Sequence, residues 1–349
     1  MPISRRSFMA LSTAAAAAAA FPAHSRAAKP AMTDDRFFDW KPVTTSGDIA
    51  AHAAFGFGGN ALLIAAKPHA LLVDCKFAYC GEQLRREAEA LAAAVGGKLT
   101  HVVNTHHHGD HTGGNVAFTP DLTIFAQTNA TPRILGQKAR YISQVKEAAT
   151  SLNAKTGPAA EQVRKDALAL YQRVETLKVT EFAPKTTFDK DYEIALGGGG
   201  AGGDNESGGL KVQLHHYGPG HTDNDIVVHI PALNLLHTGD LVFNRLHPYI
   251  DADGGGATKT WIESLKKAIE LCDAKTKVVP GHGDLCDVQA LHRQVEYFEK
   301  MRDLVAREIK LGKTRKEVAD LRPTLFEGYA APDRLGMALG AIYSELKKE

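Results

Sequence analysis

The sequence is poor in cysteine, in net charge and in long apolar runs, and each shortage argues against a class of protein. Its 349 residues include only four cysteines, and these do not have the CxxC spacing of a zinc ribbon or a redox pair. Because 41 basic residues face 40 acidic ones, the formal net charge of +1 indicates neither a nucleic-acid-binding surface nor a polybasic membrane patch. What remains, with 44% hydrophobic residues, is a globular protein with ample material for a core and no nucleic-acid partner.

The first 28 residues resemble a twin-arginine export signal. Arg5 and Arg6 precede an alanine-rich run in SRRSFMALSTAAAAAAAF, and AHSRAA offers small residues for cleavage after Ala27 or Ala28. The run is too short and too weakly apolar for a span, which needs about 20 apolar residues, although a membrane anchor or a disordered tail stays an alternative. We therefore expect a periplasmic protein, exported by the twin-arginine machinery and without a membrane anchor in its mature form.

An oxidising compartment changes what the cysteines can do. Cys272 and Cys286 flank one short predicted strand, so a disulfide between them is plausible. Cys75 and Cys80 are expected to be small buried residues instead.

Residues 29–349 are expected to form a single α/β domain, because apolar strand-like runs alternate with amphipathic helices. Helices are predicted at 81–96, at 287–312 and beyond to 349, and as two helices broken near KTGPAA in an insertion at about 130–180. The glycine-rich GGGGAGGDNESGG, residues 197–209, has nothing to bury and is expected to be a loose hairpin loop. Strands are predicted as a hairpin within 50–75 that turns at AAKPH, and at 99–105, 122–127, 186–196, 210–217, 225–231, 233–240 and 276–283.

The stretch NTHHHGDHTGGN, residues 104–115, holds four histidines and an aspartate within six positions. Such a cluster is a poor way to build a core and a good way to hold a metal ion. In an extended segment His106 and His108 point to one side and His107 to the other, while Asp110 and His111 lie about a turn further on. The spacing therefore predicts two groups of ligands a few ångströms apart.

More ligands are needed, because zinc usually takes about four and a catalytic site leaves one position for water. Three candidates, His221, Asp240 and His282, each follow a predicted strand and have a glycine beside them. Loops at strand ends are where α/β proteins collect functional groups, so we expect these side chains to join the histidine cluster.

The HxHxDH signature, followed in order by GHT, TGD and GHG, resembles the metallo-β-lactamase superfamily of hydrolases over residues 45–290. The resemblance implies a four-layer αβ/βα sandwich with two zinc ions at one edge, extended here by the helical insertion and by C-terminal helices at 287–349. It also implies that Asp240 bridges both ions. The remaining ligands it implies are His106, His108 and His221 for the first ion, and Asp110, His111 and His282 for the second.

The resemblance further implies that a hydroxide shared by the two zinc ions attacks the substrate, with Asp110 and Asp240 orienting it as the catalytic residues. Many zinc β-lactamases of this superfamily have cysteine or serine where this chain has Asp240, and the diiron flavoprotein branch usually has glutamate in place of His108. We therefore expect hydrolysis of a small ester, lactone, thioester or amide. β-Lactam hydrolysis is one alternative, and a non-catalytic periplasmic protein that binds a metal or ligand is another.

Other polar residues near these motifs have weaker indications. Asp74 ends a strand where the superfamily usually keeps an aspartate that supports the ligands. Asn224, Tyr217 and Tyr249 could reach a substrate oxygen or be structural. The histidines expected to pack near the site without holding a metal are His107, His215, His216 and His237.

Overall fold

The computed structural model describes residues 36–152, 156–173, 176–197 and 209–349. The expected export signal at residues 1–28 lies outside these described residues, and so does most of the glycine-rich stretch. Among the described residues, no helix combines the length and the apolar character needed to cross a membrane.

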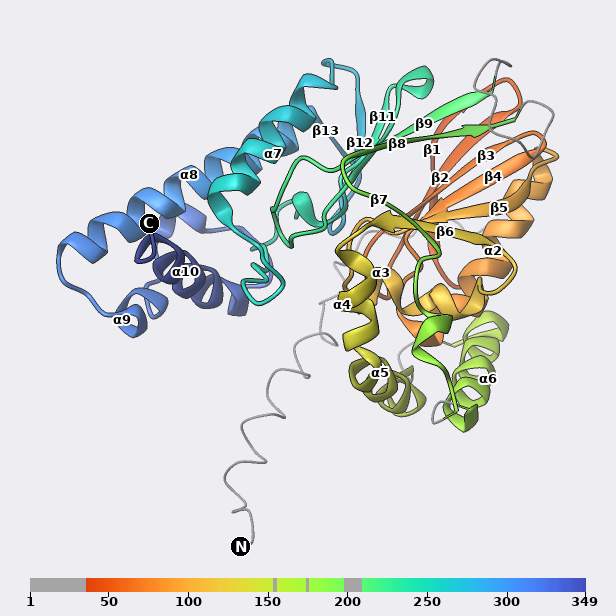
Figure 1. Cartoon of the computed structure of the whole chain (residues 1–349), viewed down its shortest axis with the longest axis horizontal. Helices are drawn as coiled ribbons and strands as arrows, with labels where there is room; N and C mark the ends of the chain where they lie inside the picture. The colour runs from red at the N-terminus through yellow and green to blue at the C-terminus, as the bar shows by residue number, and fades with distance from the viewer. Residues whose placement is uncertain (1–35, 153–155, 174–175, 198–208) are drawn as a thin grey trace, which may run out of the picture.

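Two β-sheets form the centre of the structure (Figure 1). Both are mixed, since β4 to β7 run parallel in the first sheet and β11 pairs parallel with β12 in the second. The first sheet has seven strands in chain order, namely β1 (Asp39–Ser46), β2 (Ile49–Phe55), β3 (Ala61–Ala66), β4 (His69–Val73), β5 (Lys98–Val103), β6 (Thr123–Gln127) and β7 (Thr186–Phe188). The second has six, namely β8 (Asp191–Leu196), β9 (Leu210–His215), β10 (Val227–Ile230), β11 (Leu235–His237), β12 (Lys277–Val279) and β13 (Cys286–Asp287).

Helix α2 covers the outer face of the first sheet, and α7 and α8 cover that of the second (Figure 1). Helix α6 packs on α2, and α10 packs on α8. The α-helices are α2 (Gly81–Ala94), α3 (Gly109–Thr112), α4 (Ala130–Gly136), α5 (Lys138–Ser151), α6 (Pro158–Arg173), α7 (Thr258–Glu270), α8 (Val288–Lys310), α9 (Arg315–Ala319) and α10 (Asp333–Leu346). Short 3-10 helices are η2 (Ala78–Cys80), η3 (Gly113–Ala117), η5 (Val179–Glu181), η6 (Pro231–Leu233), η7 (Gly239–Leu241) and η8 (Thr324–Phe326).

Side-chain alternation along the strands builds three apolar layers. In β3, Leu62 and Ile64 point between the two sheets, whereas Leu63 points to the helices on the outer face. All three are fully buried, so the strand is apolar throughout, as expected for a sheet covered on both faces. Each such side chain contributes about 1.5–3 kcal/mol by burial. The expected four-layer αβ/βα sandwich is confirmed.

The long helix α8 follows from its sequence. Its buried positions include Leu291, Val295, Phe298 and Met301, spaced by three or four residues so that they share one face. Asp287 caps its first turn by accepting a hydrogen bond from the Gln289 backbone N–H. The helix predicted at 287–312 is therefore confirmed, and so is the one predicted at 81–96, which is α2.

The hairpin expected within 50–75 is confirmed, because β3 and β4 pair antiparallel on either side of Lys67 and Pro68 in AAKPH. The sequence did not separate β2 from this hairpin, and it did not indicate β1, which precedes β2. The strand β1 is an edge strand with a register shift at Pro42, so it lacks the apolar alternation by which strands are recognised. The run 186–196 is two strands, β7 and β8, which lie in different sheets, because the chain crosses between the sheets at the polar residues 189–190.

The structure of the helical insertion and of the glycine-rich hairpin agrees more closely with the sequence-based predictions. Helices α5 and α6 lie on either side of KTGPAA, and α6 begins at Pro158, although a third short helix, α4, precedes them. Strands β8 and β9 pair antiparallel from Leu196 with Leu210 onward, as a hairpin requires.

The possible disulfide is not formed. All four cysteines are free thiols. The Cys272 thiol donates to the Ala268 carbonyl within its own helix turn, whereas the Cys286 thiol donates to the Val278 carbonyl across the β12–β13 pair.

Candidate metal centre

The predicted ligands come together where strands of both sheets end. The HHHGDH segment follows β5 and continues into α3, and His221 lies in the loop after β9. Asp240 lies in η7 directly after β11, and His282 follows β12. Residues more than a hundred positions apart therefore meet in one cluster, as the strand-end positions predicted.

The first ligand group consists of His106, His108 and His221. Their ligand atoms and one oxygen of Asp240 lie within 4.8 Å of one another. The Nδ1 atom of His108 is 2.9 Å from the Nε2 atom of His221, so two imidazole nitrogens face each other. Oδ2 of Asp240 lies 3.4 Å from Nε2 of His221 and 3.9 Å from Nε2 of His106.

The second ligand group consists of Asp110, His111 and His282, also within 4.8 Å of one another. Oδ2 of Asp110 lies 3.3 Å from Nε2 of His282 and 3.7 Å from Nε2 of His111. Asp240 reaches this group too, with Oδ1 3.2 Å from His111 Nε2 and Oδ2 3.3 Å from His282 Nε2. The Asp240 carboxylate thus lies between the two groups.

Several of these atoms are buried without a hydrogen-bond partner, as expected for atoms that bind metal ions. They include Nε2 of His106, Nε2 of His111 and Oδ1 of Asp240. The last two are 3.2 Å apart but not in hydrogen-bond geometry. Buried polar atoms in native proteins are almost always partnered, so a cluster of unpartnered imidazole nitrogens facing a carboxylate is the donor set that zinc and similar ions use.

In four of the five ligand imidazoles, the nitrogen that faces away from the cluster is tied to a partner. Such contacts set the tautomer and the orientation of a ligand ring and raise its basicity. The partners are Asp74 Oδ2, 2.7 Å from His111 Nδ1, Asp251 Oδ2, 2.8 Å from His108 Nε2, the Tyr249 carbonyl, 2.7 Å from His221 Nδ1, and Thr105 Oγ1, 3.1 Å from His106 Nδ1.

Asp74 was singled out in the sequence, and the structure places it directly beneath His111. Its carboxylate also accepts hydrogen bonds from the backbone N–H and the hydroxyl of Thr105. Asp251 was missed. It lies 143 positions from His108, in a polar turn where its other oxygen accepts from the Gly254 N–H, and no spacing rule connects the two. The carboxylates of YIDADGGG were the only available signal.

Burial and charge act differently on the two groups. Burial and the neighbouring His111 lower the pKa of His106 well below its usual range, and burial together with His108 lowers the pKa of His221 to about 3. Burial also disfavours the charged form of His111 and of His282, but the carboxylates of Asp240 and Asp110 outweigh it and raise both pKa values.

The carboxylates respond in the opposite sense. Burial would raise the pKa of Asp240, but His282, His111 and His106 hold it well below its usual range. Burial would likewise raise the pKa of Asp110, which His111 and His282 lower. Both side chains are therefore carboxylates at neutral pH, ready to bind a cation.

The histidines expected to lie outside the ligand set do so, with one qualification. His107 contacts the amide of Asn224 at 2.9 Å and lies 3.5 Å from Asp251, so it forms a side cluster with His108 and Asp251. The other three have partners of their own: His215 contacts Asp191, His216 the Asp225 carbonyl, and His237 the Asn60 carbonyl.

The residues considered for substrate contact have structural partners. Asn224 is fully buried, and its amide donates to His107 and to Asp223. The ring of Tyr217 stacks on His215 at a centroid distance of 5.6 Å. The backbone carbonyl of Tyr249 accepts a hydrogen bond from Nδ1 of His221, and the centroid of its ring lies 5.9 Å from that of the His108 ring.

Close backbone approach explains one glycine of the GHG motif. A Cβ atom on Gly281 would lie 2.0 Å from Oδ1 of Asp240 and 2.6 Å from the carbonyl carbon of Gly239. Backbone cannot move aside as a flexible side chain can, so only glycine lets the loop that carries His282 pass the loop that carries Asp240.

Comparison with known proteins places these motifs in a family. Residues 54–123 and 158–282 match the sequence model described as "Metallo-beta-lactamase superfamily". These two segments cover more than half of the chain and include every residue of both ligand groups together with Asp240.

Curated relatives match over shorter stretches. A "Metallo-beta-lactamase type 2" of Bacillus cereus is 30% identical over 80 residues, which is 23% of this chain and 31% of that protein. An uncharacterized protein of Mycobacterium tuberculosis is 31% identical over 97 residues, 26% of this chain and 42% of that protein. The chain thus spans less than half the length of these relatives.

Solved structures align over more of the chain. The DIM-1 metallo-beta-lactamase is 19% identical with a TM-score of 0.47, over 75% of this chain and 97% of that one. A metallo-beta-lactamase from Pontibacter korlensis is 18% identical with a TM-score of 0.47, over 74% of this chain and 99% of that one.

Proposed function

Since the chain belongs to the metallo-beta-lactamase superfamily and is a metal-dependent hydrolase, we propose that it holds two zinc ions and hydrolyses a small ester, lactone, thioester or amide. One observation carries the dinuclear part of this proposal. The Asp240 carboxylate lies within 4 Å of imidazole nitrogens from both ligand groups. Seven ligands in two groups are more than one zinc ion uses.

The residues that would hold the ions are His106, His108 and His221 for the first and Asp110, His111 and His282 for the second, with Asp240 between them. When bound, the two ions would supply charge stabilisation for a developing oxyanion and a nucleophile at neutral pH. The chain's own contribution is to fix the ligand rings through their outward hydrogen bonds and to keep both aspartates ionised.

Asp110 and Asp240 differ in their access to a substrate. The Asp110 side chain is 23% exposed, whereas that of Asp240 is 4% exposed. Asp110 is therefore the carboxylate that can accept a hydrogen bond from the attacking water, while the buried Asp240 would act as a metal ligand. The pKa of Asp110 lies below its usual range, so it orients the nucleophile as an acceptor and is a weak base.

The identity of Asp240 favours esters, lactones, thioesters and amides, because many zinc β-lactamases of this superfamily have cysteine or serine at this position. β-Lactam hydrolysis is the second candidate. The partial similarity to type 2 metallo-beta-lactamases of Bacillus cereus and Bacteroides fragilis, 30% identical over 80 and 76 residues, supports it.

A hydrolysis screen of the zinc-loaded protein separates these candidates. Chromogenic ester, lactone, thioester, amide and cephalosporin substrates are each assayed with and without a chelator. We expect chelator-sensitive turnover of an ester, lactone, thioester or amide, and Asp240→Ala should abolish it. Turnover of the cephalosporin alone would overturn the favoured substrate class and leave the hydrolase in place.

We also propose that the twin-arginine signal at residues 1–28 exports the protein and that residues 29–349 form one mature domain in the periplasm. Replacing Arg5 and Arg6 together by lysine should leave the protein in the cytoplasm. Unchanged appearance of the paired-lysine variant in the periplasmic fraction would refute this route.

A further inference from the structure

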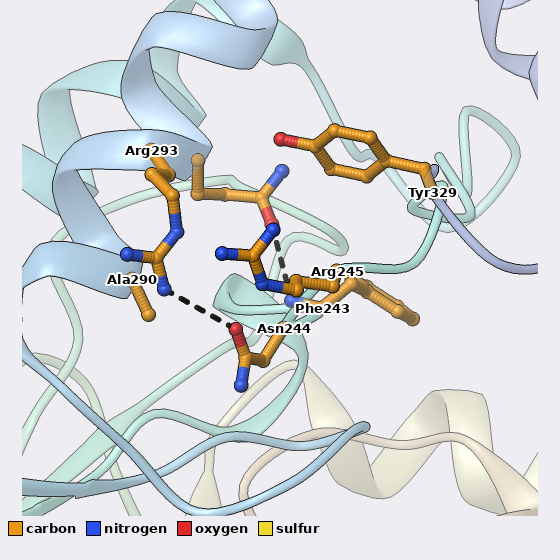
Figure 2. Close-up of a pocket in the computed structure, with 7 residues that line it drawn as sticks. Phe243, Asn244, Arg245, Ala290, Arg293 and Tyr329 are labelled. Atoms are coloured by element: carbon orange, nitrogen blue, oxygen red, sulfur yellow. Dashed lines mark hydrogen bonds between the residues drawn. The ribbon is translucent and has the colours of Figure 1, made fainter. Parts of the chain in front are cut away.

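A small pocket lies beside the candidate metal centre, and its walls are rich in hydrogen-bond donors (Figure 2). It is small and partly open to solvent. It forms where the loop after η7 meets α8 and the segment before α10. The lining residues are Phe243, Asn244, Arg245, Ala290, Arg293, Gln294 and Tyr329.

Two guanidinium groups enter this pocket from different elements, Arg245 from the loop and Arg293 from α8 (Figure 2). Neither makes an ion pair with a carboxylate of the described residues, and Arg293 has only a long contact, 3.4 Å, to the Asn244 side-chain oxygen. Glu296, which acts electrostatically on Tyr329 at the pocket wall, is ion-paired with Lys300. Two like charges in one pocket with no counter-charge are the arrangement that binds an anion.

An unpartnered donor on a residue that lines the pocket gives independent support. Gln294 is 4% exposed, and its Oε1 atom accepts a hydrogen bond of 3.1 Å from the Phe243 backbone N–H. That bond fixes the orientation of the amide. The amide nitrogen Nε2 is buried and has no hydrogen-bond partner. A buried amide N–H₂ without an acceptor calls for a ligand that accepts hydrogen bonds.

The loop is held firmly enough to present these donors. The Asn244 N–H donates to the His282 carbonyl at 2.9 Å, and the Ala330 N–H donates to the Arg245 carbonyl at 2.9 Å. The ring of Phe243 stacks on His282 with a centroid distance of 5.2 Å. The pocket is therefore built on the same loop that packs against the second ligand group.

We propose that this pocket is a binding site for a small oxyanion, either free or as the charged end of a larger molecule. Planar guanidinium groups match the oxygens of sulfate, phosphate and carboxylate by paired hydrogen bonds, and the Gln294 amide supplies a further donor. The site is separate from the metal ligands, because none of its lining residues belongs to either ligand group.

The test is titration of the zinc-loaded protein with sulfate at constant ionic strength, with chloride as the reference salt and acetate as the carboxylate probe. Calorimetry and thermal shift follow binding. We expect saturable sulfate binding, and Arg245→Gln and Arg293→Gln should each weaken it about tenfold or more, since each removes a charge-assisted pair. The control Arg307→Gln removes an exposed arginine from the same helix and should change nothing.

Gln294→Glu is the sharper variant, because its retained oxygen can still accept from the Phe243 N–H. The substitution replaces the unpartnered amide nitrogen by a carboxylate oxygen in a pocket lined by Arg245 and Arg293. This negative charge should repel sulfate and abolish its binding. It should also pair with the arginines and raise the melting temperature measured without sulfate. Sulfate affinity equal in wild type and in the Arg245→Gln/Arg293→Gln double variant would overturn the proposal and place the anion at the metals or elsewhere. Absence of saturable binding by the wild type to both sulfate and acetate would overturn it as well.

Discussion

The two ligand groups differ in composition and in charge: the first has three imidazoles, whereas the second has one carboxylate and two imidazoles. In the first, burial keeps His106 and His221 neutral, and the pKa of His221 falls to about 3. In the second, three carboxylates surround His111 and raise its pKa well above the usual value. The first group can thus bind a metal ion without losing protons, whereas the second holds protons that a metal ion must displace.

The second group contains its own counter-charge. Asp240 and Asp110 are anionic groups in a largely buried region, and they raise the pKa of His111, whose imidazolium balances their charge. Removing one partner of such a cluster leaves uncompensated charge, which is costly. The following predictions test the asymmetry, beginning with the residue that both groups share.

Asp240→Ala should affect both groups at once, because its carboxylate touches imidazoles of each. We expect turnover to fall by about 10³-fold or more on whichever substrate is found, together with loss of zinc from both positions. Steady-state kinetics and elemental analysis measure the two effects. Asp253→Ala, an exposed carboxylate nearby, is the control and should keep both ions. Normal zinc content in Asp240→Ala would contradict the shared position of this residue.

His111→Ala and His221→Ala should differ most in the metal-free protein. Loss of His111 removes the counter-charge of buried carboxylates and should cost about 3–5 kcal/mol of unfolding free energy. Loss of His221 removes a neutral ring and should cost only about 2 kcal/mol, mainly through the cavity left behind. Urea unfolding in the presence of chelator measures both. Equal costs would mean that His111 is uncharged there.

The stability of the metal-free protein should also depend on pH through His111. Because its folded pKa is raised above the unfolded value, its stabilising contribution is complete below about pH 6.5 and declines as pH rises through the folded pKa. The His111→Ala variant should lack this decline. Chemical unfolding at a series of pH values measures the slope, and identical slopes in the two proteins would contradict a raised pKa.

Asp251→Asn and Asp74→Asn should separate the groups by their supporting partners. Asp251 accepts from His108 Nε2 and so leaves Nδ1 free toward His221, whereas Asp74 supports His111. Each variant should weaken the binding of one zinc ion by about 10–100-fold and leave the affinity for the other unchanged. Competition with a chromogenic chelator resolves the two affinities, and Asp253→Asn is the matched control. A loss of both ions in Asp251→Asn would show that the groups are not separable.

Zinc uptake should release protons, and the second group should be their source. With His111 and His282 holding protons in the metal-free protein, loading near neutral pH should release about one to two protons. Calorimetry in buffers of different ionisation enthalpy gives this number. The His111→Ala variant should release about one fewer. Equal proton release by the wild type and by His111→Ala would mean that His111 is not a source of the released protons.

The sequence predicted the clustering of the candidate ligands because their signals are local. His106, His108, Asp110 and His111 are nearly contiguous, and each distant ligand sits beside a glycine at the end of an apolar run. The core strands and α8 were equally visible, because their apolar periodicity reflects burial on one or both faces. These features could be predicted without knowing which strands pair.

What the sequence could not provide depends on contacts between distant segments. Asp251 meets His108 across 143 positions, and Arg245 and Arg293 enter one pocket from different elements. The edge strand β1 was missed because a polar strand with a proline has no apolar alternation. Free Cys272 and Cys286 show that flanking one strand does not bring two thiols together.

Anomalous diffraction at the zinc edge, from crystals of the zinc-loaded protein, tests the central claim most directly. The account predicts two peaks per chain, one coordinated by His106, His108 and His221 and the other by Asp110, His111 and His282, with Asp240 contacting both. A single peak shared by the two groups, or a peak among His107, His108 and Asp251 in place of the first, would contradict it.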